Sequence, residues 1–96
     1  MNKFYLFSKT SCGPCALVDK YMAAIKDERT SLLEKVDLED FSDTPIPQEK
    51  LDLASKYGVT ATPVLIITES DGIKLEEKVG GMQITQNIRK LFDQYA

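Results

Sequence analysis

Phe4-Tyr5-Leu6-Phe7-Ser8-Lys9-Thr10-Ser11-Cys12-Gly13-Pro14-Cys15 is the stretch, residues 4–15, that decides the fold. Its apolar and aromatic start, 4–7, predicts a buried strand that runs into a polar loop. Beyond Pro14, apolar residues have the spacing of one helical face: Val18, Tyr21, Met22 and Ile25. Pro14 suits the first turn of that helix, where the amide that proline lacks would have no partner. The sequence therefore predicts a strand, a loop and a helix, with both cysteines where the helix begins.

The rest of the chain alternates between strand and helix patterns. The predicted elements are a strand at 35–38, a helix at 48–57, strands at 62–67 and 73–79, and a helix whose apolar stripe runs from 84 to 95. Residues 39–47 form an acidic, proline-containing connection. Gly58 is placed to end the predicted helix at 48–57. Asp71-Gly72 is a turn signal, so the strands on either side should form a hairpin. The order is typical of an α/β fold with a parallel crossover and an antiparallel hairpin.

Length and composition limit the organisation of the chain and its partners. The 96 residues fit a single domain, 1–96, and 43% hydrophobic with 28% charged residues is typical of a packed globule rather than a disordered chain. The net charge of −3 and scattered basic residues predict no nucleic-acid or membrane partner, and the aromatic run 4–7 is interpreted as core. The apolar run is shorter than that of a secretory signal, and we expect a cytoplasmic monomer.

Cys12 and Cys15 are the only cysteines, and the chain has no histidine. A thiol is nucleophilic as thiolate, and the unpaired amides at the start of a helix stabilise that anion. We therefore predict that Cys12 is the nucleophile and that Cys15, one turn along, attacks a mixed disulfide on Cys12. Lys9, just upstream, would favour the thiolate or attract an anionic thiol. Without further ligands, a mononuclear zinc site is excluded, as is base catalysis by histidine.

Three other hypotheses for the cysteine pair stay open. The first is an inert disulfide, but closing a four-residue loop stabilises by only about 2 kcal/mol, less than the ~3 kcal/mol of a 15-residue loop. The second is a metal or iron–sulfur site shared between two chains, each of which contributes its thiolates. The third is a non-enzymatic role as the subunit of a larger enzyme. Redox exchange needs no cofactor beyond the disulfide itself.

Three motifs, in order along the chain, resemble those of thioredoxins. Cys12-Gly13-Pro14-Cys15 resembles their active-site motif, and its position between a strand and a helix is the same. Ala54-Ser55-Lys56-Tyr57-Gly58-Val59, followed by Thr62-Pro63-Val64-Leu65, resembles the stretch that leads to their cis-proline. Val79-Gly80-Gly81 before the last helix is the third match. The resemblance implies a thioredoxin-like fold, with a four-stranded mixed sheet and helices on both faces.

The resemblance also implies roles for particular residues. Pro63 would follow a cis peptide bond and pack opposite the cysteines, and the backbone of Thr62 would pair with an extended substrate segment. The chain departs from thioredoxins in lacking their first strand and helix, which is the shorter layout of glutaredoxins. Ser11 stands where thioredoxins usually have tryptophan, and Leu6 stands where they have a buried acid. Another acceptor for the proton of Cys15, such as Asp19, Asp37 or water, is then needed.

Ser8-Lys9-Thr10-Ser11-Cys12 also resembles glutaredoxins, in which a lysine at the position of Lys9 and a glycine pair like Gly80-Gly81 hold glutathione. Against this, Gly13-Pro14 replaces their Pro-Tyr, and Gln83 replaces the acid that receives the glutathione amine. We therefore expect a thioredoxin-like reductant of protein disulfides, with a glutathione-dependent glutaredoxin as the alternative. The resemblance implies thioredoxin reductase or glutathione as electron donor, and enzymes that cycle a disulfide, such as ribonucleotide reductase, as clients.

Overall fold

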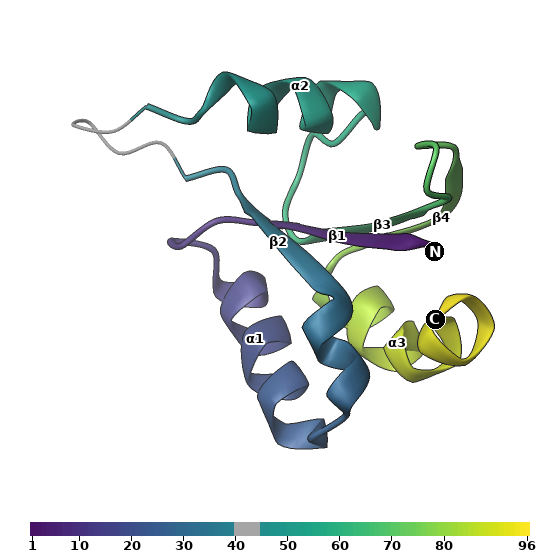
Figure 1. Cartoon of the computed structure of the whole chain (residues 1–96). Coiled ribbons are helices and arrows are strands. Elements are labelled where there is room, and N and C mark those ends of the chain that lie inside the picture. Colours follow the sequence, from purple (N-terminus) through teal and green to yellow (C-terminus); the bar gives the residue numbers. More distant parts are fainter. Residues whose placement is uncertain (40–44) are drawn as a thin grey trace.

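The computed structural model describes residues 1–39 and 45–96, so part of the predicted connection at 39–47 lies outside the described residues. The elements follow the order shown in Figure 1: β1 (Lys3–Ser8), α1 (Gly13–Ile25), the short 3₁₀ helix η1 (Glu28–Leu32), β2 (Leu33–Asp37), α2 (Gln48–Lys56), β3 (Val64–Thr68), β4 (Lys74–Val79) and α3 (Gly81–Tyr95). This confirms the predicted order of strands and helices.

The four strands form one mixed sheet in the order β2-β1-β3-β4. β1 runs parallel to β2 and antiparallel to β3, and β3 and β4 form the predicted antiparallel hairpin. The two central strands are almost wholly buried, whereas the edge strands β2 and β4 are mostly exposed or half-buried. Helices on both faces explain why the central strands consist mainly of apolar residues.

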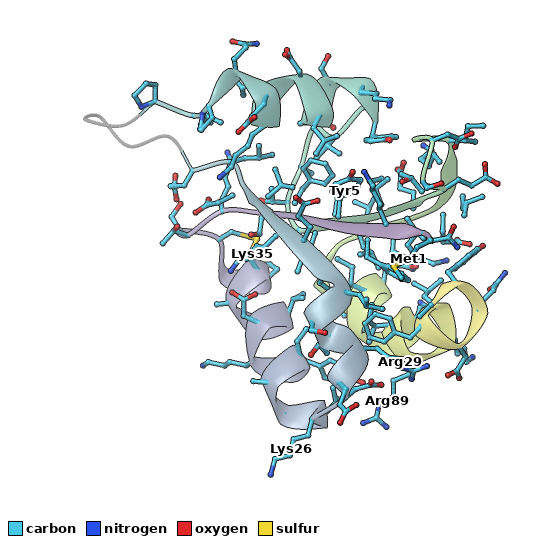
Figure 2. The ribbon with its side chains drawn as sticks, in the orientation of Figure 1. Met1, Tyr5, Lys26, Arg29, Lys35 and Arg89 are labelled. Carbon is cyan, nitrogen blue, oxygen red and sulfur yellow. A yellow bond between two sulfur atoms is a disulfide. The ribbon has the colours of Figure 1, made fainter. Side chains whose placement is uncertain are left out.

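Helices cover the two faces of the sheet unequally: α1 and α3 pack on one face and α2 packs on the other (Figure 1). Because side chains alternate along a strand, β1 contributes to both cores. Phe4 and Leu6 belong to the core under α1 and α3, and Tyr5 and Phe7 belong to the core under α2. Tyr5 is labelled on the α2 side of the sheet in Figure 2. The α/β fold with helices on both faces and the interpretation of 4–7 as core are thus confirmed.

The structure corrects the bounds of two strands. β2 covers 33–37 rather than 35–38, because its pairing with β1 begins at Leu33, opposite Phe4. β3 begins at Val64 rather than at Thr62, because the chain turns at the cis bond between Thr62 and Pro63, and Pro63 lacks the amide that a central strand would use. The helix η1, which precedes β2, was not predicted.

Arg29 joins η1 to the last helix. Its guanidinium bonds to Asp27 at 2.8 Å and to Asp93 at 2.7 Å, and it lies 5.2 Å from the centre of the Phe92 ring. Figure 2 shows Arg29 beside α3. The hydrogen bonds from Arg29 lower the pKa of Asp27 from 3.8 to about 2. This cluster secures the crossover between α1 and β2 against α3.

Candidate functional site

The two cysteines form a disulfide at the start of α1. Cys12 is the N-cap residue, with extended backbone angles of φ −95° and ψ 117°, and its sulfur accepts a hydrogen bond from the backbone amide of Cys15 at 3.2 Å. The Cα atoms are 5.2 Å apart. Cys15 is only 2% exposed, whereas Cys12 is partly exposed. Cys12 is therefore the sulfur that another molecule can reach, and an anion on it would be stabilised by the helix N-terminus.

The Thr62-Pro63 segment lies beside Cys12. The bond between Thr62 and Pro63 is cis, which confirms the prediction for this peptide. The carbonyl oxygen of Thr62 is 3.7 Å from the Cys12 sulfur, although fifty residues separate them in sequence. The amide of Gly80 donates to the carbonyl of Pro63 at 2.9 Å. The first two motifs thus meet where β1 ends and β3 begins, in the middle of the sheet, and the third motif is hydrogen-bonded to Pro63 of the second.

Gly80 and Gly81 differ in what they do for the site. Gly80 has φ +93° and ψ 153°, a conformation that side chains rarely permit, and it caps α3. Gly81 begins the helix, and a Cβ atom there would lie 3.4 Å from the carbonyl oxygen of Pro14 and 3.7 Å from Val18. The start of α3 therefore approaches the active-site loop closely, while Gly13 has open space around it.

Lys9 is exposed on the loop between β1 and α1, and its carbonyl accepts the amide hydrogen of Cys12 at 3.4 Å. It lines a cavity of about 550 Å³ that also includes Thr62. Its lining also includes Leu51 of α2 and Val59, which follows that helix. Neither cysteine lines this cavity; it approaches the disulfide through Thr62, whose carbonyl oxygen lies 3.7 Å from the Cys12 sulfur.

The two acids considered as proton acceptors for Cys15 are engaged elsewhere. Asp19 pairs with Lys35 at 2.7 Å. Asp37 accepts hydrogen bonds from the Thr10 hydroxyl at 3.3 Å and from the amide of Glu39 at 2.9 Å. The structure places neither carboxylate in a hydrogen bond with a cysteine among the described residues.

Glu39 is the site residue that the sequence analysis missed. Its carboxylate accepts a hydrogen bond of 2.8 Å from the backbone amide of Ser11, the residue before Cys12. The signal that could have found it is its place just after β2, because the carboxyl ends of parallel strands meet at the same edge of a sheet. Ser8, at the end of β1, is 1% exposed, and its hydroxyl has no hydrogen-bond partner in the described part of the chain.

The described residues contain no group of three or more histidine, cysteine, aspartate or glutamate residues placed to hold a metal ion. Within the same ranges, 1–39 and 45–96, no helix is long and apolar enough to cross a membrane.

Comparison with known proteins gives one family and many similar folds. A family model described as a thioredoxin-like domain matches residues 2–96. The structure is similar to that of Fasciola hepatica thioredoxin, with 24% identity, a TM-score of 0.71 and coverage of 99% of this chain and 81% of that chain. It is also similar to a mutant thioredoxin from Halobacterium salinarum, with 26% identity, a TM-score of 0.69 and coverage of 98% of this chain and 74% of that chain. A third similar structure is the Schistosoma mansoni thioredoxin pre-protein, with 21% identity, a TM-score of 0.71 and coverage of 99% of this chain and 79% of that chain. No curated protein sequence matches the chain.

Proposed function

The chain belongs to the thioredoxin-like domain family, and from this premise we propose that it reduces protein disulfides as thioredoxins do, through Cys12 and Cys15. As a family member with a disulfide between these two cysteines, it is a thiol–disulfide oxidoreductase. The observation that carries the proposal is the unequal exposure of the pair, with Cys12 accessible beside Thr62 and Cys15 buried behind it.

The exchange proceeds in two balanced steps. In the reduced chain, the Cys12 thiolate attacks one sulfur of the substrate disulfide; a mixed disulfide forms, and the other substrate sulfur leaves as a thiolate that takes up a proton. Cys15 then loses its proton and attacks the sulfur of Cys12. The disulfide within the chain forms, and the second substrate thiol is released. Two electrons have passed to the substrate, and an external thiol donor must return two to the chain.

A protein substrate suits the backbone next to the disulfide. Thr62 precedes β3, whose pairing with β1 and β4 begins at Val64. Its carbonyl group lies beside Cys12 outside that ladder, which supports the proposal that it pairs with an extended segment around a substrate cysteine. Gly80, bonded to Pro63, and Gly81 complete this side of the docking edge.

The proposed setting follows from the family. The protein acts as a cytoplasmic monomer, uses no cofactor beyond its own disulfide and receives electrons from thioredoxin reductase. Enzymes that cycle a disulfide, such as ribonucleotide reductase, are the client class. Glutathione is the alternative donor, and the observation that favours it is that Lys9 lines the same cavity as Thr62, the residue next to Cys12.

The experiment compares how fast the oxidised protein is recycled by thioredoxin reductase and by glutathione with its reductase, with one protein disulfide as substrate. Faster recycling by thioredoxin reductase supports the proposal. Faster recycling by glutathione supports the glutaredoxin alternative. The Cys15→Ser variant should accumulate the mixed disulfide on Cys12, and the Cys12→Ser variant should not. No turnover with either donor would contradict exchange chemistry and favour the role as a subunit or a shared metal site.

A further inference from the structure

The loop that carries Cys12 is held by two carboxylates from the end of β2. The amide of Ser11 donates to the Glu39 carboxylate at 2.8 Å, and the Thr10 hydroxyl donates to Asp37 at 3.3 Å. Both bonds reach across 27 or 28 residues of sequence. The backbone amide of Ser11, the residue before Cys12, is thus held by a charged side chain that lies two residues beyond the end of β2.

The sheet explains why these groups meet. β1 and β2 are parallel, with Ser8 opposite Asp37, and the amide of Leu38 extends the ladder by donating to the carbonyl of Ser8 at 2.8 Å. The carboxylate of Asp37 then accepts the amide of Glu39 at 2.9 Å, which turns the chain beyond the strand. Figure 1 shows that both strands finish at the same end of the sheet. Glu39 therefore comes to the loop through backbone pairing rather than by a chance surface contact.

Glu39 brings a negative charge as well as an acceptor. Its pKa is lowered by the hydrogen bond from Ser11 and, to a smaller degree, by the charge of Lys9, while Asp37 acts in the opposite direction. It is therefore ionised at neutral pH. A carboxylate close to Cys12 opposes a second negative charge on that sulfur, whereas the helix N-terminus and Lys9 favour it.

We propose that Glu39 is a positioning residue of the redox site, which fixes the loop before Cys12 through the Ser11 amide and, by its charge, limits the fraction of Cys12 present as thiolate. The proposal rests on the proposed function only in taking Cys12 as the nucleophile. Because the reduced form carries the thiolate, this charge also lowers the reduction potential of the pair and makes the chain a stronger reductant.

The test separates charge from hydrogen bonding with two variants. Glu39→Gln keeps an oxygen that can accept from Ser11 but removes the charge, and Glu39→Ala removes both. Glu34→Gln is the matched control, since it makes the same charge change on an exposed residue of β2, five residues away along the chain. At that spacing along a strand, the charge of Glu34 lies farther from the position of Glu39 than the screening length at physiological salt.

The reduced full-length chains are alkylated with iodoacetamide at pH 6, and the adduct on Cys12 is quantified by mass spectrometry. Glu39→Gln should react about threefold faster than the parent, the effect of one unit charge near an exposed loop, and its pH profile should move to lower pH. Glu34→Gln should react at the parent rate. An unchanged or slower rate in Glu39→Gln would overturn the electrostatic role.

The positioning role is read from hydrogen exchange of the Ser11 amide in the same proteins. Exchange should be faster in Glu39→Ala and unchanged in Glu39→Gln, and equal protection in both variants would overturn this role. Both readouts use a small electrophile or solvent and need no protein substrate. Failure of this proposal can therefore be told apart from failure of the proposed function, which would appear as absent turnover in the recycling assay.

Discussion

Replacing Gly80 with alanine tests whether this glycine is needed for the backbone conformation at the start of α3, apart from any role in binding substrate. Gly80 has φ +93° and ψ 153°, in a region occupied almost only by glycine, and a non-glycine residue held in such a region costs about 1–3 kcal/mol. A Cβ atom there would meet nothing within 4 Å, so conformational strain and not a clash sets the cost. We expect Gly80→Ala to lower the free energy of unfolding by about 2 kcal/mol.

Urea unfolding followed by circular dichroism measures this loss. With a denaturant slope of about 1–1.5 kcal/mol per molar, typical of a small domain, the midpoint should fall by about 1.5 M. The amide of Gly80 bonds to the carbonyl of Pro63, so if the variant relieves its strain by moving, the bond beside the redox site should weaken as well. Slower exchange with a protein disulfide is then expected along with the lower stability.

Gly81→Ala is the control within the same pair. Gly81 is the first residue of α3, its backbone needs no left-handed conformation, and its new Cβ would make a contact of 3.4 Å with Pro14. Its free energy of unfolding should stay within about 1 kcal/mol of the parent, since the better helix propensity of alanine offsets a tight contact. The reasoning is refuted if Gly80→Ala is as stable as the parent, or if the two variants lose the same amount.

Three further predictions concern stability. Tyr57→Phe should cost about 1 kcal/mol in urea unfolding, because the Tyr57 hydroxyl donates to the carbonyl of Gly72 at 2.7 Å from a site only 8% exposed. Ser8→Ala should raise the melting temperature, with a gain of about 1 kcal/mol, because it removes a buried hydroxyl that has no partner in the described part of the chain; a loss of stability would contradict this. Asp27, whose pKa is lowered by Arg29 from 3.8 to about 2, stabilises the fold above pH 4 and loses this contribution as the pH falls toward 2. Asp27→Asn should therefore be less stable than the parent at pH 6, and the difference between them should shrink by pH 2.

The elements and the redox pair could be predicted because their signals are local. The apolar run at 4–7, the helical spacing after Pro14 and the turn at Asp71-Gly72 each lie within a few residues, and each predicted an element that the structure contains. The signal for the pairing of Cys12 with Cys15 is local too, because residues three apart at the start of a helix lie about one turn from each other. The start of β3 was predicted wrongly, at Thr62 instead of Val64, although a local signal was present. Pro63 has no backbone amide to donate to a neighbouring strand, and the prediction did not take this into account.

The contacts that complete the site could not be predicted in the same way. Glu39 reads in sequence as the first residue of an acidic connection, and only the parallel pairing of β1 with β2 carries it to Ser11. Thr62 reaches Cys12 because β3 lies beside β1 in the sheet, and the resemblance to thioredoxins, not a local signal, predicted that this segment lies opposite the cysteines. Neither partner differs in residue type from many others on the surface of the chain.

The sequence by itself determined the order of strands and helices, the position of the cysteine pair at a helix start and, through its resemblance to thioredoxins, the cis bond before Pro63. These depend on spacing along the chain, which the residues state directly. Tertiary structure alone decided which carboxylate holds the Cys12 loop, how closely Gly81 approaches Pro14 and which sulfur is exposed. Such distances depend on strand order and helix packing, because residues far apart in sequence become neighbours only after the whole sheet has formed.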